Sequence, residues 1–183
     1  MVAALVVAYF TWGRHKGPKI KQGDTVFLFG DSLAQGLRGP LSKLASSSGV
    51  GFGADVQQGT RFDQWLSRGP DGAGGATYAL ISLGTNDAMA NDAHKAKVPE
   101  WARSISAALK AQGTTPIWIL PPPMHFDTSV AHDAVDATKD AFYVSGDYPR
   151  YDSIHPTPAA FDQWAQDIWT KLTKLRTRCL RRA

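Results

Sequence analysis

Short apolar runs alternate with amphipathic stretches along the chain, and several of the runs end at polar, glycine-containing turns. Runs of this length, bounded by turn signals, are typical of strands that are buried in a sheet with both faces covered. We therefore predict five strands, at residues 25–29, 50–57, 78–83, 116–120 and 141–144.

Most of the stretches between these strands carry apolar residues at helical spacing, which predicts a helix after nearly every strand. The predicted helices are residues 33–47, a short helix around Phe62, Trp65 and Leu66, and residues 99–112, 129–141 and 158–176. Within the first of them, Gly39-Pro40 should bend or restart the helix, because proline lacks an N–H group. Alternating strands and helices predict an α/β fold, a parallel sheet in a three-layer α/β/α domain.

The 183 residues fit one domain with a single core. We expect an apolar segment and basic linker at residues 1–22, the folded domain at 23–170 and a basic tail at 171–183. The lone Cys179 excludes an internal disulfide and cysteine-based catalysis.

The net charge of +4 comes from the tail, where six basic residues occur in the last thirteen with no acid. The remaining sequence has 14 basic against 16 acidic residues, so no nucleic-acid-binding surface is expected. The tail could contact phosphates or an anionic membrane, or be a solvated helix end, where cations are favoured.

Residues 2–12 are almost continuously apolar but too few to span a bilayer, which takes about 20 residues. They lack the basic start and cleavage site of a secretory signal. Two interpretations stay open: the core of an anchor or export segment, or an arm that packs on a partner. Membrane-associated, cell-envelope and cytoplasmic locations therefore all remain open.

A serine stands at the abrupt end of the first strand, in Gly30-Asp31-Ser32. Ligands bind at the carboxyl edge of open α/β sheets, where the following helix offers free N–H groups. Ser32 is therefore a candidate nucleophile, although Asp or Ser at such a turn can also be only a helix cap.

Acyl transfer by serine needs a base, a group that orients the base, and donors for the developing oxyanion. His155 lies three residues after Asp152, a spacing that lets the carboxylate accept the imidazole Nδ1 proton. Gly59 can bring its N–H close to a ligand, and Asn86 can offer a side-chain amide. Each also has an ordinary interpretation: a loop histidine, a turn glycine and an Asx turn or helix cap.

Together, four segments resemble the SGNH, or GDSL, family of serine esterases and lipases. They are Gly30-Asp31-Ser32-Leu33, Gln58-Gly59-Thr60, Gly84-Thr85-Asn86-Asp87 and Asp152-Ser153-Ile154-His155-Pro156. They occur in the family's order and rough spacing, and the resemblance covers about residues 24–169.

The resemblance implies a flavodoxin-like sandwich with five parallel strands in the order 2-1-3-4-5. It implies Ser32 as nucleophile, His155 as base and Asp152 as its orienting carboxylate. The oxyanion hole would consist of the N–H groups of Ser32 and Gly59 and the amide of Asn86. No metal or organic cofactor is implied.

Three details accompany this assignment. Asp31 and Asp87 match family positions but are interpreted as hydrogen-bonding residues that shape loops. Ser153 stands where the family usually has glycine, which puts the conformation of that loop in question. The only rival base and acid, His125 and Asp127, are interpreted as lining the rim of the site.

The expected substrate is a carboxylic ester, with a short acyl group such as acetate on a carbohydrate or cell-envelope polymer. The loops at 88–97 and 121–127 contain no long apolar lid of the kind a lipase would need. Alternatives are short-chain lipid or thioester hydrolysis, acyl transfer to another alcohol, and a non-catalytic binding module of an envelope or virion assembly. In that module, residues 2–12 and the tail would contact the membrane or assembly.

Overall fold

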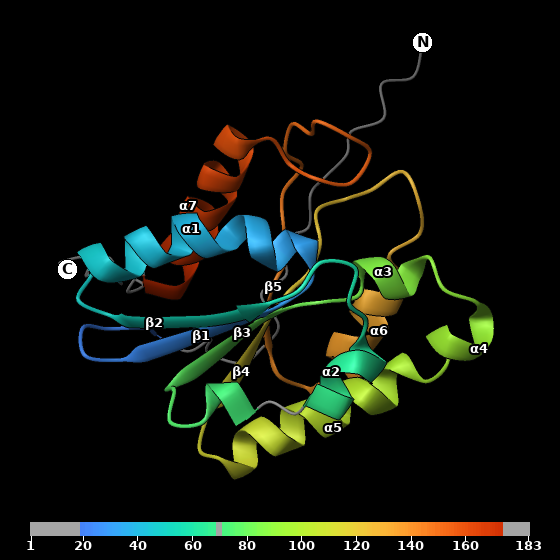
Figure 1. Cartoon of the computed structure of the whole chain (residues 1–183), viewed down its shortest axis with the longest axis horizontal. Helices are drawn as coiled ribbons and strands as arrows, with labels where there is room; N and C mark the ends of the chain where they lie inside the picture. The colour runs from blue at the N-terminus through green and yellow to red at the C-terminus, as the bar shows by residue number, and fades with distance from the viewer. Residues whose placement is uncertain (1–18, 69–70, 174–183) are drawn as a thin grey trace, which may run out of the picture.

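A computed structural model describes residues 19–68 and 71–173, which contain one five-stranded sheet (Figure 1). The strands are β1 (Thr25–Gly30), β2 (Gly51–Val56), β3 (Tyr78–Ser82), β4 (Thr115–Ile119) and β5 (Ala141–Tyr143). Every pair of neighbours is parallel, and their order is β2-β1-β3-β4-β5. The predicted parallel sheet and its strand order are confirmed.

Helices cover both faces of the sheet, with α1 and α7 on one face and α2, α5 and α6 on the other (Figure 1). The helices are α1 (Ser32–Ser47), α2 (Phe62–Arg68), α3 (Thr85–Ala88), α4 (Asp92–Lys95), α5 (Val98–Ala111), α6 (Ser129–Thr138) and α7 (Pro158–Thr173). A 3₁₀ turn, η1 (Asp71–Ala73), precedes β3. The three-layer architecture follows from strands that are apolar on both faces.

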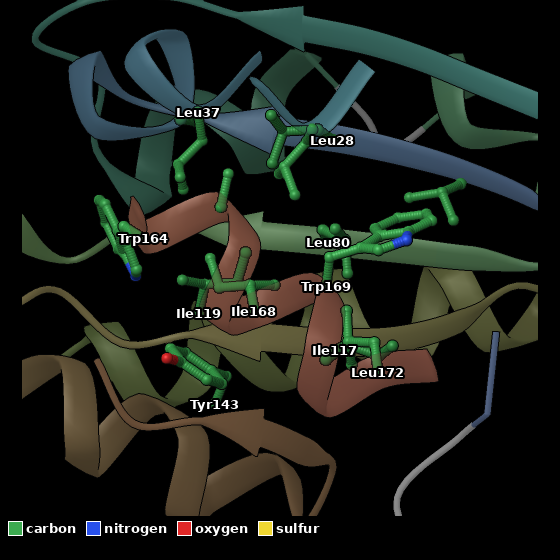
Figure 2. Packing of buried hydrophobic residues seen from close by; sticks show 14 of the residues in the cluster. Leu28, Leu37, Leu80, Ile117, Ile119, Tyr143, Trp164, Ile168, Trp169 and Leu172 are labelled. Carbon is green, nitrogen blue, oxygen red and sulfur yellow. The ribbon is translucent and has the colours of Figure 1, made fainter. Parts of the chain in front are cut away.

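Successive residues of each strand point to opposite layers of the core. Leu28 and Leu80 pack with Leu37 of α1 and Trp164 of α7, and all four are fully buried (Figure 2). On the other face, the alternate strand positions pack against α2, α5 and α6; they include Phe29, Ala79, Ile81 and Trp118. This rigid sheet fixes the places at which the strand-ending loops begin.

The expected restart of the first helix at Gly39-Pro40 does not occur, because α1 continues through Pro40 to Ser47. Proline removes one helical hydrogen bond. Leu37, Leu41 and Ala45 are fully buried along one stripe of this helix on both sides of Pro40. Burying each of the two leucines contributes about 1.5–3 kcal/mol, and together they offset the cost of about 3 kcal/mol that proline adds inside a helix.

Residues 88–97 were expected to form a loop, but they contain the short helix α4. Asn91 begins it by accepting a hydrogen bond from the His94 N–H at 2.9 Å, which is ordinary N-cap chemistry. One turn of helix has too few positions to show a periodic pattern.

Residues 2–12, Cys179 and the last ten residues of the basic tail lie outside the described residues. Among residues 19–68 and 71–173, no helix combines the length and apolar character that crossing a membrane requires.

Candidate active site

Three neighbouring strands, β2, β1 and β3, end level with one another, so the turns that follow them begin side by side. Gly30 at the end of β1 is in register with Val56 of β2 and with Ser82 of β3. The turns after these strands carry Ser32, Gly59 and Asn86, which the sequence assigned to one site.

The β1–α1 turn presents Ser32 as the first residue of α1. Gly30 is required before it, since a Cβ there would overlap the carbonyl oxygen of Ser82. That same oxygen accepts the Asp31 N–H at 3.1 Å. The Asp31 Oδ1 atom then accepts the Leu33 N–H at 2.9 Å and caps the helix.

Ser32 lies in a chain of hydrogen bonds with His155 and Asp152, although 123 positions separate the serine from the histidine. The Ser32 Oγ is 2.8 Å from Nε2 of His155, and Nδ1 of the same ring is 2.8 Å from Asp152 Oδ2. A carboxylate that accepts the Nδ1 proton leaves Nε2 with a lone pair for the serine hydroxyl. The structure therefore brings the three predicted residues together.

The loop that holds the pair is organised by Asp152 itself. Its Oδ1 atom accepts the N–H groups of Ile154 and His155 at 2.7 and 2.6 Å. Hydrogen bonds from the backbone and ring of His155 and from Ile154 lower the Asp152 pKa to about 2. Ser153 does not have a positive φ angle, so glycine is not needed there.

The three predicted oxyanion donors differ in how they are held. Asn86 donates from Nδ2 to the Thr60 carbonyl at 3.0 Å, and a longer contact of 3.4 Å joins it to Asp31 Oδ2. Gly59 has φ +71°, and within the described residues its N–H has no hydrogen-bond partner. The Ser32 N–H is in the first turn of α1, where amides have no partner within the helix.

Asp31 is completely buried beneath these groups. Its burial, with a further contribution from the charge of Asp87, raises its pKa to about 7, and the N–H of Leu33 opposes this rise. Asp87 accepts the Phe62 N–H at 3.2 Å and contacts His94 Nε2 at 2.7 Å. Both aspartates thus make the loop-shaping hydrogen bonds that the sequence analysis assigned to them.

Sequence reasoning missed Thr60 and Trp65, which shape the loop around Gly59. The Thr60 hydroxyl donates to the Gln57 carbonyl at 2.7 Å and accepts the Trp65 indole N–H at 3.0 Å. A threonine after Gln-Gly signals a local turn. Its partner five residues later becomes visible only once α2 is placed.

The rival pair His125 and Asp127 does not form a hydrogen-bonded pair in the described structure. His125 packs edge-on against Phe126, with ring centroids 5.2 Å apart. Asp127 accepts the N–H and hydroxyl of Ser129 at 2.8 and 3.0 Å, at the start of α6. These contacts give Asp127 a role in beginning a helix.

An exposed aromatic side chain stands beside the histidine. Tyr151 is 67% exposed, and its ring stacks on that of His155 at a centroid distance of 5.7 Å and an angle of 12°. Its N–H donates to the His155 carbonyl at 3.1 Å, which closes the loop.

Comparisons of sequence gave no relatives: no protein-family profile and no curated protein matches the chain. Comparison with solved structures found several proteins of similar fold. Axe2, an acetylxylan esterase from Geobacillus stearothermophilus, has a TM-score of 0.67 at 16% identity, covering 87% of this chain and 100% of its own. LAE5, an alpha/beta hydrolase enzyme from the metagenome of Lake Arreo, Spain, has the same score at 12% identity, covering 85% and 99%.

TesA is a further match, with a TM-score of 0.64 at 20% identity, covering 81% of this chain and 98% of its own. Two catalytic mutants of Axe2 change an aspartate and a histidine that lie three positions apart. Another Axe2 mutant replaces the tryptophan directly before that aspartate. These three matches cover 81–87% of the chain, which has the fold of the SGNH-type hydrolases.

Proposed function

We propose that the protein is a serine ester hydrolase that works through an acyl-enzyme. The observation that carries the proposal is the continuous hydrogen-bonded chain from Ser32 Oγ through His155 to Asp152. The fold also supports the proposal, because structures of an acetylxylan esterase and of an acylhydrolase are similar to this one. The three-residue spacing of Asp152 and His155 also equals that of the two residues changed in the Axe2 catalytic mutants.

In the first half-reaction, His155 Nε2 takes the proton from Ser32 Oγ as this oxygen attacks the carbonyl carbon of the ester. The carbonyl oxygen becomes negative in the tetrahedral intermediate. His155 then gives its proton to the leaving alcohol, and the acyl group stays on Ser32.

In the second half-reaction, a water molecule attacks the acyl-enzyme and gives its proton to His155. As the bond to Ser32 Oγ breaks, His155 returns this proton to the oxygen, which releases the carboxylic acid and regenerates the Ser32 hydroxyl. Asp152 accepts the Nδ1 proton throughout and stabilises the imidazolium, and its lowered pKa keeps it ionised above about pH 3.

The donors assigned to the oxyanion are the N–H groups of Ser32 and Gly59 and the amide of Asn86. The hydrogen bond from Asn86 to the Thr60 carbonyl fixes the amide, and its second N–H makes only the long 3.4 Å contact with Asp31. That second hydrogen is therefore available to a developing oxyanion. One such donor contributes roughly 2.7–4 kcal/mol to the transition state.

For the substrate, we propose a short acyl group, acetate first, on a carbohydrate. The acetylxylan esterase among the matches supports this choice. Tyr151 supports it independently, because an exposed aromatic ring beside the base offers an apolar face to the C–H groups of a sugar. A tryptophan takes the corresponding place before the aspartate in Axe2.

The test is hydrolysis of p-nitrophenyl acetate, butyrate and octanoate, and of an acetylated xylo-oligosaccharide, by the wild type and Ser32→Ala. We expect turnover that favours acetate and disappears in Ser32→Ala. Ser104→Ala is a matched control, since its exposed hydroxyl bonds only to the Glu100 carbonyl of its own helix. Equal activity in Ser32→Ala and the control would overturn the assignment of the nucleophile.

Added alcohols distinguish hydrolysis from acyl transfer, which would use the same residues. A new acetylated acceptor, formed at the expense of acetate, identifies a transferase. A folded wild type with no turnover on any ester would favour the binding-module alternative.

A further inference from the structure

A second cluster of ionisable side chains lies where α2, α3 and α4 meet. It consists of Asp63 of α2, Asp87 of α3 and His94 of α4. Each residue offers one ligand atom, and these three atoms all lie within 4.8 Å of one another. Figure 1 shows that α3 and α4 follow each other on one side of the molecule.

The cluster contains buried carboxylate oxygens that accept no hydrogen bond from the described residues. Asp87 has no exposed side-chain surface, and its Oδ2 atom makes no hydrogen bond. The buried Oδ1 atom of Asp63 also makes none, and its nearest cation is Arg61 Nε at 3.8 Å. A buried carboxylate oxygen without a donor is costly, so two of them in one cluster require an explanation.

Neighbouring cations only partly neutralise the negative charge of the Asp63 and Asp87 carboxylates. His94 Nε2 lies 2.7 Å from the other oxygen of Asp87, and the ring is positive only when protonated. A divalent cation would supply both the missing charge and the missing partners.

The geometry and chemistry of the donors fit zinc. One imidazole nitrogen and two carboxylate oxygens bind Zn²⁺ at about 2.0–2.2 Å, which puts tetrahedral ligand atoms about 3.3–3.5 Å apart. The ligand atoms would therefore move by about 1.5 Å at most from their present separations of up to 4.8 Å. The His94 ring packs edge-on against the Trp101 ring, with ring centroids 4.8 Å apart, and this contact holds the His94 ring in place.

We propose that Asp63, Asp87 and His94 form a binding site for a single Zn²⁺ ion, with water as the fourth ligand. The ion would link α2 and α4 to α3, where its ligand Asp87 directly follows Asn86. It is distinct from the Ser32 site and takes no part in the acyl transfer described above.

The test is the stoichiometry and affinity of Zn²⁺ for the tag-free protein, measured by native mass spectrometry and isothermal titration after removal of metal. We expect one equivalent in the wild type and a rise in melting temperature on Zn²⁺ addition, because the ion binds the folded state. His94→Gln and Asp63→Asn should each weaken binding at least tenfold.

His132→Gln is the matched control, because His132 is exposed on α6 and outside the cluster. Asp63→Asn changes a partly exposed side chain, so its result remains informative if His94→Gln does not fold. Ser32→Ala should bind zinc like the wild type, which separates this proposal from the esterase assignment. Absence of stoichiometric binding, or equal binding by the wild type and both cluster variants, would overturn it.

Discussion

The molecule contains two His-Asp pairs with nearly the same distance between the ring nitrogen and the carboxylate oxygen. His155 Nδ1 lies 2.8 Å from Asp152 Oδ2, and His94 Nε2 lies 2.7 Å from Asp87 Oδ1. The Asp152 side chain is 44% exposed, whereas that of Asp87 is completely buried. The two carboxyl groups shift in opposite directions: hydrogen bonds lower the pKa of Asp152, and burial raises that of Asp87.

The two pairs differ in the other contacts that each histidine makes. Nε2 of His155 faces the Ser32 hydroxyl, so its pair can accept a proton from this proposed nucleophile. The ring of His94 packs against Trp101, and its aspartate accepts the Phe62 N–H. A His-Asp pair therefore indicates proton transfer only when a third, reactive group lies at the free ring nitrogen.

The largest expected effect separates the two histidines by activity. His155→Ala removes the proposed base, and we expect kcat to fall by roughly 10⁴-fold or more. His94→Ala should retain measurable turnover, because its ring does not contact Ser32. The measurement is kcat on p-nitrophenyl acetate, with circular dichroism to verify folding. Equal losses in both variants would contradict the distinction between the pairs.

The next effect concerns Asp31, whose pKa is about 7 in the folded protein against an ordinary value of 3.8. The folded state holds this proton more tightly than the unfolded state. The stability contributed by the neutral acid is therefore complete below about pH 4 and is lost as the pH rises through about 7. The loss amounts to about 4 kcal/mol.

Asp31→Asn cannot ionise and keeps an acceptor for the Leu33 N–H. Relative to the wild type, it should gain about 4 kcal/mol in free energy of unfolding between pH 4 and pH 8. Urea unfolding of both proteins at several pH values measures this difference. The pH dependence that comes from the other titratable groups is the same in both proteins and cancels. A difference that stays constant with pH would show that Asp31 remains ionised.

A smaller effect separates the two aspartates by stability. Asp87→Ala leaves the buried Phe62 N–H without an acceptor, which costs about 1–3 kcal/mol. Asp152→Ala should lose less stability but much more activity, since its side chain is exposed and contacts the base. Urea unfolding in EDTA, paired with kcat, tests both variants. A greater loss of stability in Asp152→Ala would reverse the roles inferred from burial.

Local patterns were sufficient for the parallel sheet, and the resemblance of four local segments to a family supplied its strand order and the candidate site residues. Buried strands are short apolar runs, and Gly30-Asp31-Ser32 and Asp152-Ser153-Ile154-His155 are local segments, so both are visible in the sequence. The contacts between α2, α3 and α4 were not predictable in this way. Asp63, Asp87 and His94 come together only through tertiary packing, and the single turn of α4 is too short to show a period. The continuity of α1 through Pro40 likewise depends on burial, which overrides local propensity.

The smallest effect is expected at Ser153, the position at which the sequence departs from the family pattern. The loop around the exposed His-Asp pair is held by the two N–H groups that donate to Asp152, and neither hydrogen bond involves Ser153. Because Ser153 does not adopt a positive φ angle, glycine would relieve no strain. It would only add freedom to the unfolded chain, at a cost of about 0.5–1 kcal/mol. Ser153→Gly should therefore leave kcat within about twofold of the wild type. A marked gain in kcat would mean that Ser153 holds His155 away from its best geometry, and that the loop is less well organised than its hydrogen bonds indicate.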